Sequence, residues 1–169
     1  LDAVMALEAV DVQAIKDAHF KVVLDAINSV GGIIMPRLLD RLGVECVKLN
    51  CDPTGDFAHN PEPLPKNLTD LSETVVKENA DLGISVDPDV DRLAFICENG
   101  EPFVEEYTLV SGASYLFQRA AAIAKKEGKT LEEVTAPYTP ISCSNLSSSR
   151  ARRDVHEEQG GKYHASAFG

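Results

Sequence analysis

The sequence predicts an α/β protein, a three-layer α/β/α arrangement around a mixed sheet of about four strands. Short runs rich in β-branched residues alternate along the chain with segments whose apolar residues recur at helical spacing. Such alternation favours a parallel or mixed sheet that helices cover on its faces. The 169 residues are 44% apolar and 25% charged, which is typical of a globular protein with its own core.

The first predicted elements are a helix, a strand, a second helix and a second strand. Residues 3–18 are expected to form one helix with an imperfect apolar stripe. Residues 21–27 predict a buried strand that leaves through a glycine-rich turn. Pro36 suits the first turn of the next helix, and Gly43 suits the position just after its end. Residues 44–49 then alternate like a second strand.

A proline-rich segment, residues 50–66, predicts a long loop before the next helix. Asn67 is expected to cap that helix, and Leu68, Leu71 and Val75 share one of its faces.

Two strands, a turn and a long helix complete the predicted domain. Residues 82–86 and 93–97 are short apolar runs typical of strands. The Asn99-Gly100 pair predicts a hairpin turn, because both residues tolerate positive φ. Residues 107–126 predict a long helix.

We expect three parts along the chain: an N-terminal linking helix, an α/β/α domain, and the truncated start of a further domain, over residues 1–18, 19–130 and 137–169. Residues 127–140 contain a glycine and two prolines and predict the boundary. Beyond it, a strand from Ile141, a helix over 146–159 and a strand within 162–168 are expected.

Charge and composition argue against several classes of partner. The formal net charge of −11 repels nucleic-acid backbones and anionic lipid, so neither partner is expected. The sequence has no run of 18 apolar residues and no signal peptide, so we expect no transmembrane helix. The four cysteines lack zinc-site spacing and are expected to be reduced thiols of a cytoplasmic protein.

Three aspartates alternate in the loop between the last two predicted strands. Ionised carboxylates of Asp87, Asp89 and Asp91 would repel one another at close range. A hard divalent cation such as Mg²⁺ or Ca²⁺, which prefers oxygen ligands, removes that conflict. The sequence therefore predicts a metal site with these three residues as ligands. The alternative is a solvated loop in which the carboxylates point apart.

The same spacing occurs in a calcium-binding EF-hand, with Glu98 at the twelfth position. That motif requires glycine at the sixth position, where this chain has Arg92, and it requires flanking helices rather than strands. The EF-hand interpretation is therefore disfavoured.

Arg92 directly follows the third aspartate. Beside a cation, its guanidinium can hold a phosphate oxygen bidentately and reverse the local negative field. This would let an acidic protein handle a phosphoester. The alternative role is an ion pair with one of the aspartates.

The motif D-x-D-x-D-R between two strands resembles the metal loop of the α-D-phosphohexomutases, which include phosphoglucomutases, phosphomannomutases and phosphoglucosamine mutases. Further stretches are similar to the opening strand, proline-rich loop and last helix of that family's second domain, and to the start of its third; they are residues 20–32, 60–65, 105–107 and 144–149. The resemblance implies an internal fragment, domain II plus the start of domain III, of a four-domain enzyme.

The resemblance also implies an activity. The parent would be an isomerase, an intramolecular phosphotransferase that interconverts 1-phospho and 6-phospho sugars of the glucose or mannose type. A serine in another domain would carry the phosphoryl group, and a bisphosphorylated sugar would reorient. Asp87, Asp89 and Asp91 would bind Mg²⁺, and Arg92 would have a catalytic role at the phosphoryl group. Hexose phosphate and the remaining domains of the parent chain would be the partners.

This sequence departs from the family pattern in ways that bear on activity. His59-Asn60-Pro61 partly matches the family's phosphoserine loop, but Ala58 stands at the serine position, so a structural role is expected. With no phosphoserine loop or sugar-recognition loop in the sequence, the chain is expected to be inactive alone. Two alternatives are a non-catalytic divalent-metal-binding or interaction module of the same fold, and a phosphatase with Asp87 as the nucleophile.

Overall fold

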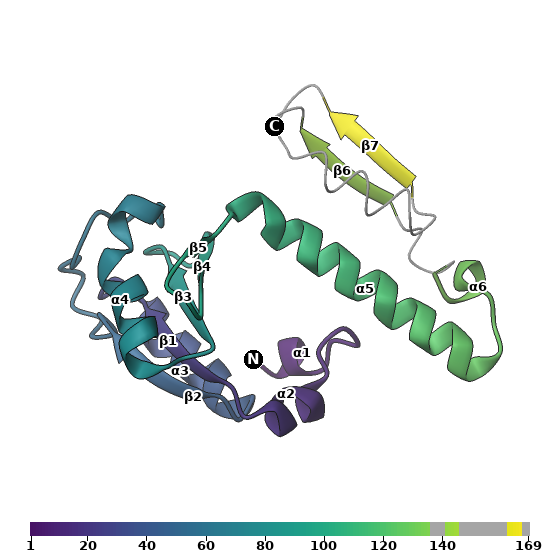
Figure 1. The fold of residues 1–169 in the computed structure, drawn as a ribbon, viewed down its shortest axis with the longest axis horizontal. Coiled ribbons are helices and arrows are strands. Elements are labelled where there is room, and N and C mark those ends of the chain that lie inside the picture. Colours follow the sequence, from purple (N-terminus) through teal and green to yellow (C-terminus); the bar gives the residue numbers. More distant parts are fainter. Residues whose placement is uncertain (136–140, 146–161, 167–169) are drawn as a thin grey trace. The chain divides into compact units, whose positions relative to one another are not determined.

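The computed structural model describes residues 1–135, 141–145 and 162–166 (Figure 1). The chain divides into two compact units, Leu1–Phe103 and Val104–Gly169. The domain limits drawn from the sequence stay a prediction. The helix expected over 146–159 lies outside the described residues.

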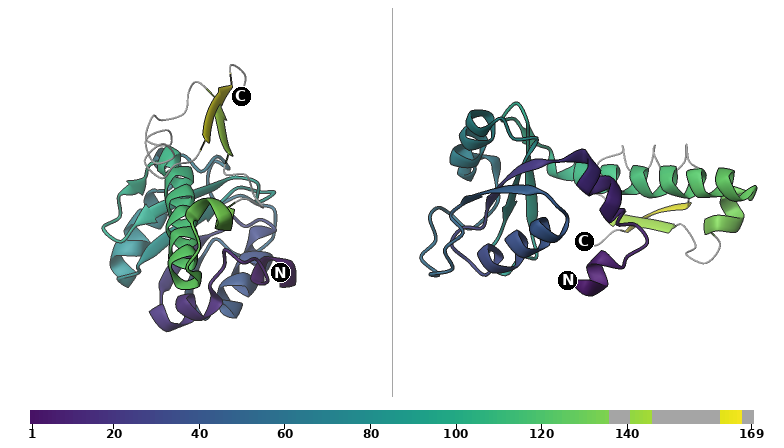
Figure 2. Two further views of the ribbon diagram at one scale, coloured as in Figure 1. Left: turned by 90° about the vertical axis from the view of Figure 1, so that its right-hand side faces the viewer. Right: turned by 90° about the horizontal axis from the view of Figure 1, so that it is seen from below.

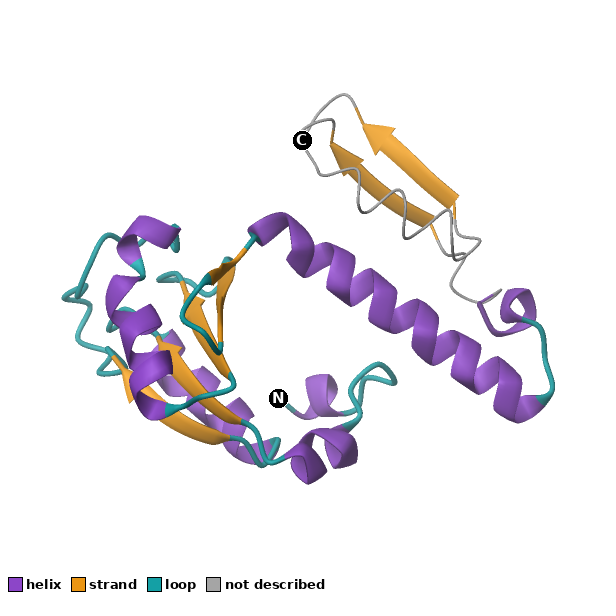
Figure 3. Cartoon of the chain, in the orientation of Figure 1, coloured by secondary structure: helices purple, strands orange, loops and turns teal. Residues whose placement is uncertain are grey.

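A mixed sheet of five strands, in the order β2-β1-β3-β4-β5, forms the centre of the first unit (Figure 3). β1 (Lys21–Asp25) pairs in parallel with β2 (Glu45–Leu49) on one side and β3 (Leu82–Val86) on the other. β4 (Leu93–Cys97) and β5 (Pro102–Phe103) add antiparallel pairings. The prediction of an α/β fold with a mixed sheet of about four strands is confirmed, with one short edge strand added.

Helices cover both faces of this sheet (Figures 1 and 2). On one face, β1 presents Val22 and Leu24 to a core that also includes residues of α3 (Gly31–Arg41). On the opposite face, Val23 packs with Leu68 and with Leu71 and Val75 of α4 (Thr69–Glu78). Side chains alternate between faces because successive residues of a strand point in opposite directions. The result is the predicted three-layer arrangement.

The connections between the parallel strands determine where a site can form. β1 leads to β2 through α3 on one face, and β2 leads to β3 through α4 on the other. The chain therefore leaves the carboxyl ends of β1 and β2 toward opposite faces. In open α/β sheets, ligands bind at such a point, outside the carboxyl ends of the strands.

The prediction of a single helix over residues 3–18 is wrong. The structure has two helices, α1 (Asp2–Met5) and α2 (Val12–Ala18). The Asp11 carboxylate accepts a hydrogen bond from the Ala14 backbone N–H at 3.0 Å. A side-chain cap of this kind begins a new helix, so the apolar stripe read across both segments does not belong to one helix.

Pro36 does not mark the first turn of its helix, because α3 begins five residues earlier, at Gly31. In this first turn, a Cβ added at Gly32 would lie 2.3 Å from the Cys51 carbonyl oxygen. The chain after β2 therefore lies directly against the first turn of α3. The predicted stop is confirmed, since Gly43 follows the helix with a φ of +70°.

Asn67 does not cap α4, contrary to expectation. It ends a short 3-10 helix, η1 (Pro65–Asn67), and Leu68 occupies the N-cap position. The Asn67 side-chain amide instead donates to the Glu62 carbonyl at 2.8 Å. Its hydrogen-bonding capacity is thus used to hold the proline-rich loop.

The hairpin turn between β4 and β5 forms as predicted, but with different backbone angles. Gly100 has a φ of +83°, whereas Asn99 lies outside the left-handed region. The Asn99 side-chain oxygen accepts from the Glu101 N–H at 3.0 Å, which stabilises the turn without a positive φ at Asn99.

The described residues of the second unit form two helices and a pair of strands. α5 (Glu105–Glu127) confirms the predicted long helix, and α6 (Leu131–Thr135) lies within the stretch predicted as a boundary. β6 (Ile141–Asn145) and β7 (Lys162–Ser166) pair in parallel and confirm the two candidate strands. Within the described part of the chain, we find no helix with the length and apolar character that a membrane span requires.

Candidate metal centre and the neighbouring loop

The aspartate loop, residues 87–92, connects the carboxyl end of β3 to β4. Its turn is tight, because the Val90 N–H donates to the Asp87 carbonyl at 3.1 Å. Val90 has a φ of +63°, a conformation that β-branched residues rarely adopt. Strands flank the loop on both sides, which contradicts the EF-hand interpretation.

Asp87 is the buried anchor of this loop, with a side chain only 1% exposed. Its Oδ1 accepts from the backbone N–H groups of Asp91 and Arg92, each at 3.0 Å, and its Oδ2 accepts from Arg92 Nε at 3.0 Å. Burial by itself would raise the pKa of Asp87, but these hydrogen bonds and the Arg92 charge outweigh it and lower the pKa. A carboxylate offers about four lone-pair sites, so Oδ2 retains capacity for one more ligand.

The three carboxylates converge. One oxygen from each of Asp87, Asp89 and Asp91 lies within 4.8 Å of the others, and Asp89 and Asp91 are exposed. The hydrogen-bond contact with Asp87, followed by the charges of Asp87 and Asp89, raises the pKa of Asp91. Crowded hard oxygen donors of this kind fit a divalent cation such as Mg²⁺ or Ca²⁺. The geometry contrasts with a loop of splayed side chains, and the ligand roles stay a prediction.

Arg92 lies between carboxylates of two loops. Besides its bond to Asp87, Nε is 3.6 Å from Asp91 Oδ1, and Nη1 is 3.8 Å from Glu62 Oε1. The ion pair considered as an alternative role is therefore present. It engages Nε, while the side chain is 57% exposed, so the guanidinium can also meet an anion from solvent. Its predicted catalytic role stays a prediction.

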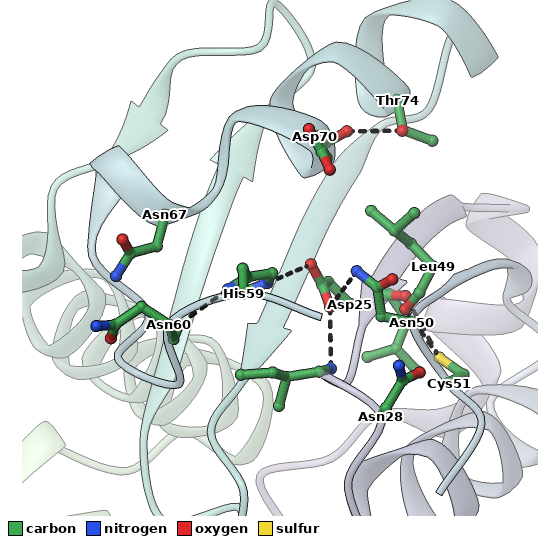
Figure 4. Close-up of polar contacts among 12 residues, drawn as sticks. Asp25, Asn28, Leu49, Asn50, Cys51, His59, Asn60, Asn67, Asp70 and Thr74 are labelled. Atoms are coloured by element: carbon green, nitrogen blue, oxygen red, sulfur yellow. Dashed lines mark hydrogen bonds and ion pairs between the residues drawn. The ribbon is translucent and has the colours of Figure 1, made fainter. Parts of the chain in front are cut away.

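A second buried carboxylate, Asp25, ends β1 at the same edge of the sheet and was missed by the sequence reasoning. It is 1% exposed. It accepts from the Ile27 N–H at 2.9 Å and from the Asn50 side-chain amide at 3.2 Å, and His59 Nε2 lies 3.0 Å from its Oδ2 (Figure 4). The signal available in the sequence was an aspartate at the end of a buried apolar strand, as at Asp87.

His59 connects the proline-rich loop to Asp25. Its second ring nitrogen, Nδ1, lies 2.9 Å from the Asn60 carbonyl oxygen, so both nitrogens face acceptors. Burial by itself would lower the pKa of His59, but the hydrogen bonds to Asp25 and Asn60 and the charges of Asp25 and Asp70 raise it above 6.5. This arrangement favours the imidazolium, in which both nitrogens donate.

Glu62 is the other residue that sequence reasoning missed. Its N–H donates to the Asn60 side-chain oxygen at 3.1 Å, and its carbonyl accepts from Asn67 at 2.8 Å. These two contacts hold its backbone at a place from which its carboxylate reaches Arg92. No pattern in the sequence indicates this contact, since Glu62 and Arg92 lie on separate loops.

Comparison with known proteins identifies the family. The family model for phosphoglucomutase/phosphomannomutase, alpha/beta/alpha domain II, matches residues 1–100. The chain belongs to this family. The resemblance to the α-D-phosphohexomutases is thereby confirmed. In this mutase-family chain, the mixed sheet positions both buried aspartates.

Three relatives illustrate the match. A phosphoglucomutase/phosphomannomutase of Thermococcus kodakarensis is 37% identical over 86% of the chain and 29% of its own length. A probable phosphoglucosamine mutase of Methanosarcina barkeri is 49% identical over 49% of the chain and 19% of its own length. A crystal structure of a phosphoglucomutase/phosphomannomutase family protein from Burkholderia thailandensis superposes with a TM-score of 0.73 and 25% identity, covering 94% of this chain and 32% of that one. The mutase-family chain thus spans less than a third of these relatives.

Proposed function

We propose that this chain provides the metal-binding domain of a Mg²⁺-dependent phosphohexomutase, which interconverts 1-phospho and 6-phospho sugars of the glucose or mannose type. The observation that supports this most is the convergence of three carboxylates within 4.8 Å, beside an exposed guanidinium. The names of the relatives, phosphoglucomutase/phosphomannomutase and phosphoglucosamine mutase, agree with a hexose phosphate substrate.

Each residue of the loop has a distinct task in this proposal. Asp89, Asp91 and the remaining lone pair of Asp87 would hold the ion. When bound, Mg²⁺ neutralises negative charge on phosphoryl oxygens. Asp87 also fixes Arg92 through Nε, and the exposed guanidinium binds an anionic oxygen of the phosphoryl group. Phosphoryl transfer depends mostly on such positioning and charge stabilisation.

The remaining parts of the reaction lie beyond these residues. We propose that an enzyme phosphoserine in another domain donates the phosphoryl group and that a bisphosphorylated sugar reorients before returning one. Residues 137–169 would open a further domain. The chain by itself would therefore not turn over substrate.

The test uses the full-length protein that contains this chain. We expect Mg²⁺-dependent conversion of glucose 1-phosphate or mannose 1-phosphate to the 6-phosphate, with glucosamine phosphate as a third substrate to compare. Asp91→Asn should reduce turnover by about a hundredfold or more, because a preorganised charge contact is lost. Glu98→Gln, which removes an exposed carboxylate just beyond the far end of β4, is the control. Normal turnover by Asp91→Asn would refute the metal role, and metal binding without turnover by the wild type would support a non-catalytic module.

A further inference from the structure

A continuous series of polar contacts joins the two buried aspartates through the proline-rich loop. It runs from Asp25 to His59 at 3.0 Å, from His59 to the Asn60 carbonyl at 2.9 Å, and from the Asn60 side chain to the Glu62 N–H at 3.1 Å. From the Glu62 carboxylate it continues to Arg92 at 3.8 Å, and Arg92 bonds to Asp87 at 3.0 Å. Figure 4 shows the Asp25 end of this series.

The charged anchor of the loop is the contact between His59 and Asp25. Most residues between 52 and 66 are exposed, whereas the His59 side chain is only 19% exposed. Nearer to β2, the loop is also held by Asn28, which accepts from the Gly55 N–H at 3.0 Å and donates to the Asp56 carbonyl at 3.1 Å. His59 therefore fixes the half of the loop that carries Glu62 together with the Asn67 amide, which donates to the Glu62 carbonyl at 2.8 Å.

The contact between Glu62 and Arg92 orients the guanidinium and adds little to the stability of the protein. Both side chains are more than half exposed, at 56% and 57%, and exposed ion pairs stabilise proteins little. The guanidinium is nevertheless attracted at two different nitrogens, Nε by Asp87 and Nη1 by Glu62. Two attachments restrict the rotation of the guanidinium more than one does.

We propose that His59 is a positioning residue for Arg92: its ion pair with Asp25 fixes the proline-rich loop so that Glu62 holds the guanidinium in the direction from which it meets an anionic group. The inference deepens the proposed function and rests on it where activity is concerned. The charged groups that face His59 are Asp25 at the end of β1 and Asp70 in α4, and both favour the protonated ring.

The first experiment observes Arg92 without relying on activity. In the metal-free 169-residue chain, the Nε–H resonance of Arg92 is followed by NMR while the pH is raised through the titration of the His59 ring. We expect the Arg92 Nε–H resonance and the His59 ring signals to shift with the same midpoint pH. Glu62→Gln should abolish the shift of the Arg92 resonance. Asp52→Asn, which removes an exposed carboxylate from the same loop, should leave the response intact. An Arg92 signal that stays constant through the His59 titration in the wild type would overturn the proposal.

The second experiment is a double-mutant cycle in the full-length protein. His59→Gln and Glu62→Gln should each lower kcat by about three- to tenfold with little change in KM. The double variant should be no slower than Glu62→Gln, because His59 acts through Glu62. Independent, multiplicative effects would overturn the proposal, provided that the unfolding midpoint of Glu62→Gln equals that of the wild type. If the wild type shows no turnover, the proposed mutase function is refuted but the positioning role of His59 is not. The NMR result would still decide that role.

Discussion

Asp25 and Asp87 are buried carboxylates at the ends of neighbouring parallel strands, and each lies 3.0 Å from a basic side chain of a loop, His59 and Arg92 respectively. Asp25 pairs with Ser85, two residues before Asp87, so the two anchors lie close together at one edge of the sheet. A buried carboxylate is stable only when hydrogen bonds and opposite charge compensate its lost hydration. Each buried aspartate therefore requires its basic partner, and this requirement fixes the loop that carries the partner.

The first prediction concerns the cost of crowding three carboxylates. Asp91→Asn should raise the thermal unfolding midpoint of the metal-free chain, because it removes a like charge beside Asp87 and Asp89. The same substitution should reduce or abolish the further rise that Mg²⁺ gives the wild type, since an ion stabilises the state that binds it. Thermal unfolding with and without Mg²⁺ measures both. A variant that is stabilised by Mg²⁺ as much as the wild type would exclude Asp91 as a ligand.

The second prediction compares a buried with an exposed aspartate of the same loop. Asp87→Asn should destabilise the chain by about 1–3 kcal/mol, because a buried network loses its charged acceptor for Arg92 Nε. Asp89→Asn, at an exposed position, should leave stability unchanged or slightly raised. Urea unfolding at neutral pH measures both free energies. Equal stabilities of the two variants would show that the Asp87 network does not hold the loop.

The third prediction concerns pH. Because the folded state raises the pKa of His59 above 6.5, the ion pair contributes its full stability below that pH. The contribution is lost as the pH rises through the folded-state pKa. The stability difference between the wild type and His59→Gln should therefore be largest below pH 6.5 and shrink above it. His19→Asn, which removes an exposed imidazole and leaves the contact between His59 and Asp25 in place, is the control.

The fourth prediction tests the packing between α4 and the sheet. A Cβ at Gly83 would lie 2.8 Å from Val75 Cγ2 and 2.9 Å from Ile96 Cβ, so Gly83→Ala should destabilise by about 1–3 kcal/mol. Among the described residues, and leaving aside the nearby backbone of α5 itself, nothing lies within 4 Å of a Cβ placed at Gly112. Gly112→Ala should therefore stabilise by about 0.5–1 kcal/mol, because alanine favours a helix. Chemical unfolding of both variants decides the matter, and a neutral Gly83→Ala would contradict the tight packing.

The strands could be predicted from the sequence because their signal is local. The apolar runs that became β1 and β3 are each bounded by turn residues, and their alternation with helices indicated the layers. The helix starts were harder, because tertiary contacts determine them. Cys51 lies against Gly32 in the first turn of α3, and the Asn67 amide bonds to the Glu62 carbonyl instead of capping α4.

Some residues of the candidate site could likewise be predicted from the sequence, and others could not. The aspartate loop was recognisable because its three carboxylates lie within one short segment, whose turn brings them together. The contact between Asp25 and His59 joins residues 34 positions apart, and Glu62 meets Arg92 across two loops. Such pairs depend on strand order and loop path, which one sequence does not specify.

Val90 gives the loop a property that matters for ion capture. Its backbone is left-handed, which costs a branched side chain about 1–2 kcal/mol. The side chain packs against the core beneath α3, and this packing holds the strained conformation. A glycine there would relieve the strain but let the turn sample other shapes. With valine, the segment loses its conformational freedom when the protein folds rather than when a cation arrives. The ion would then meet a receptor that is already shaped, so that less of its binding energy goes into ordering the chain.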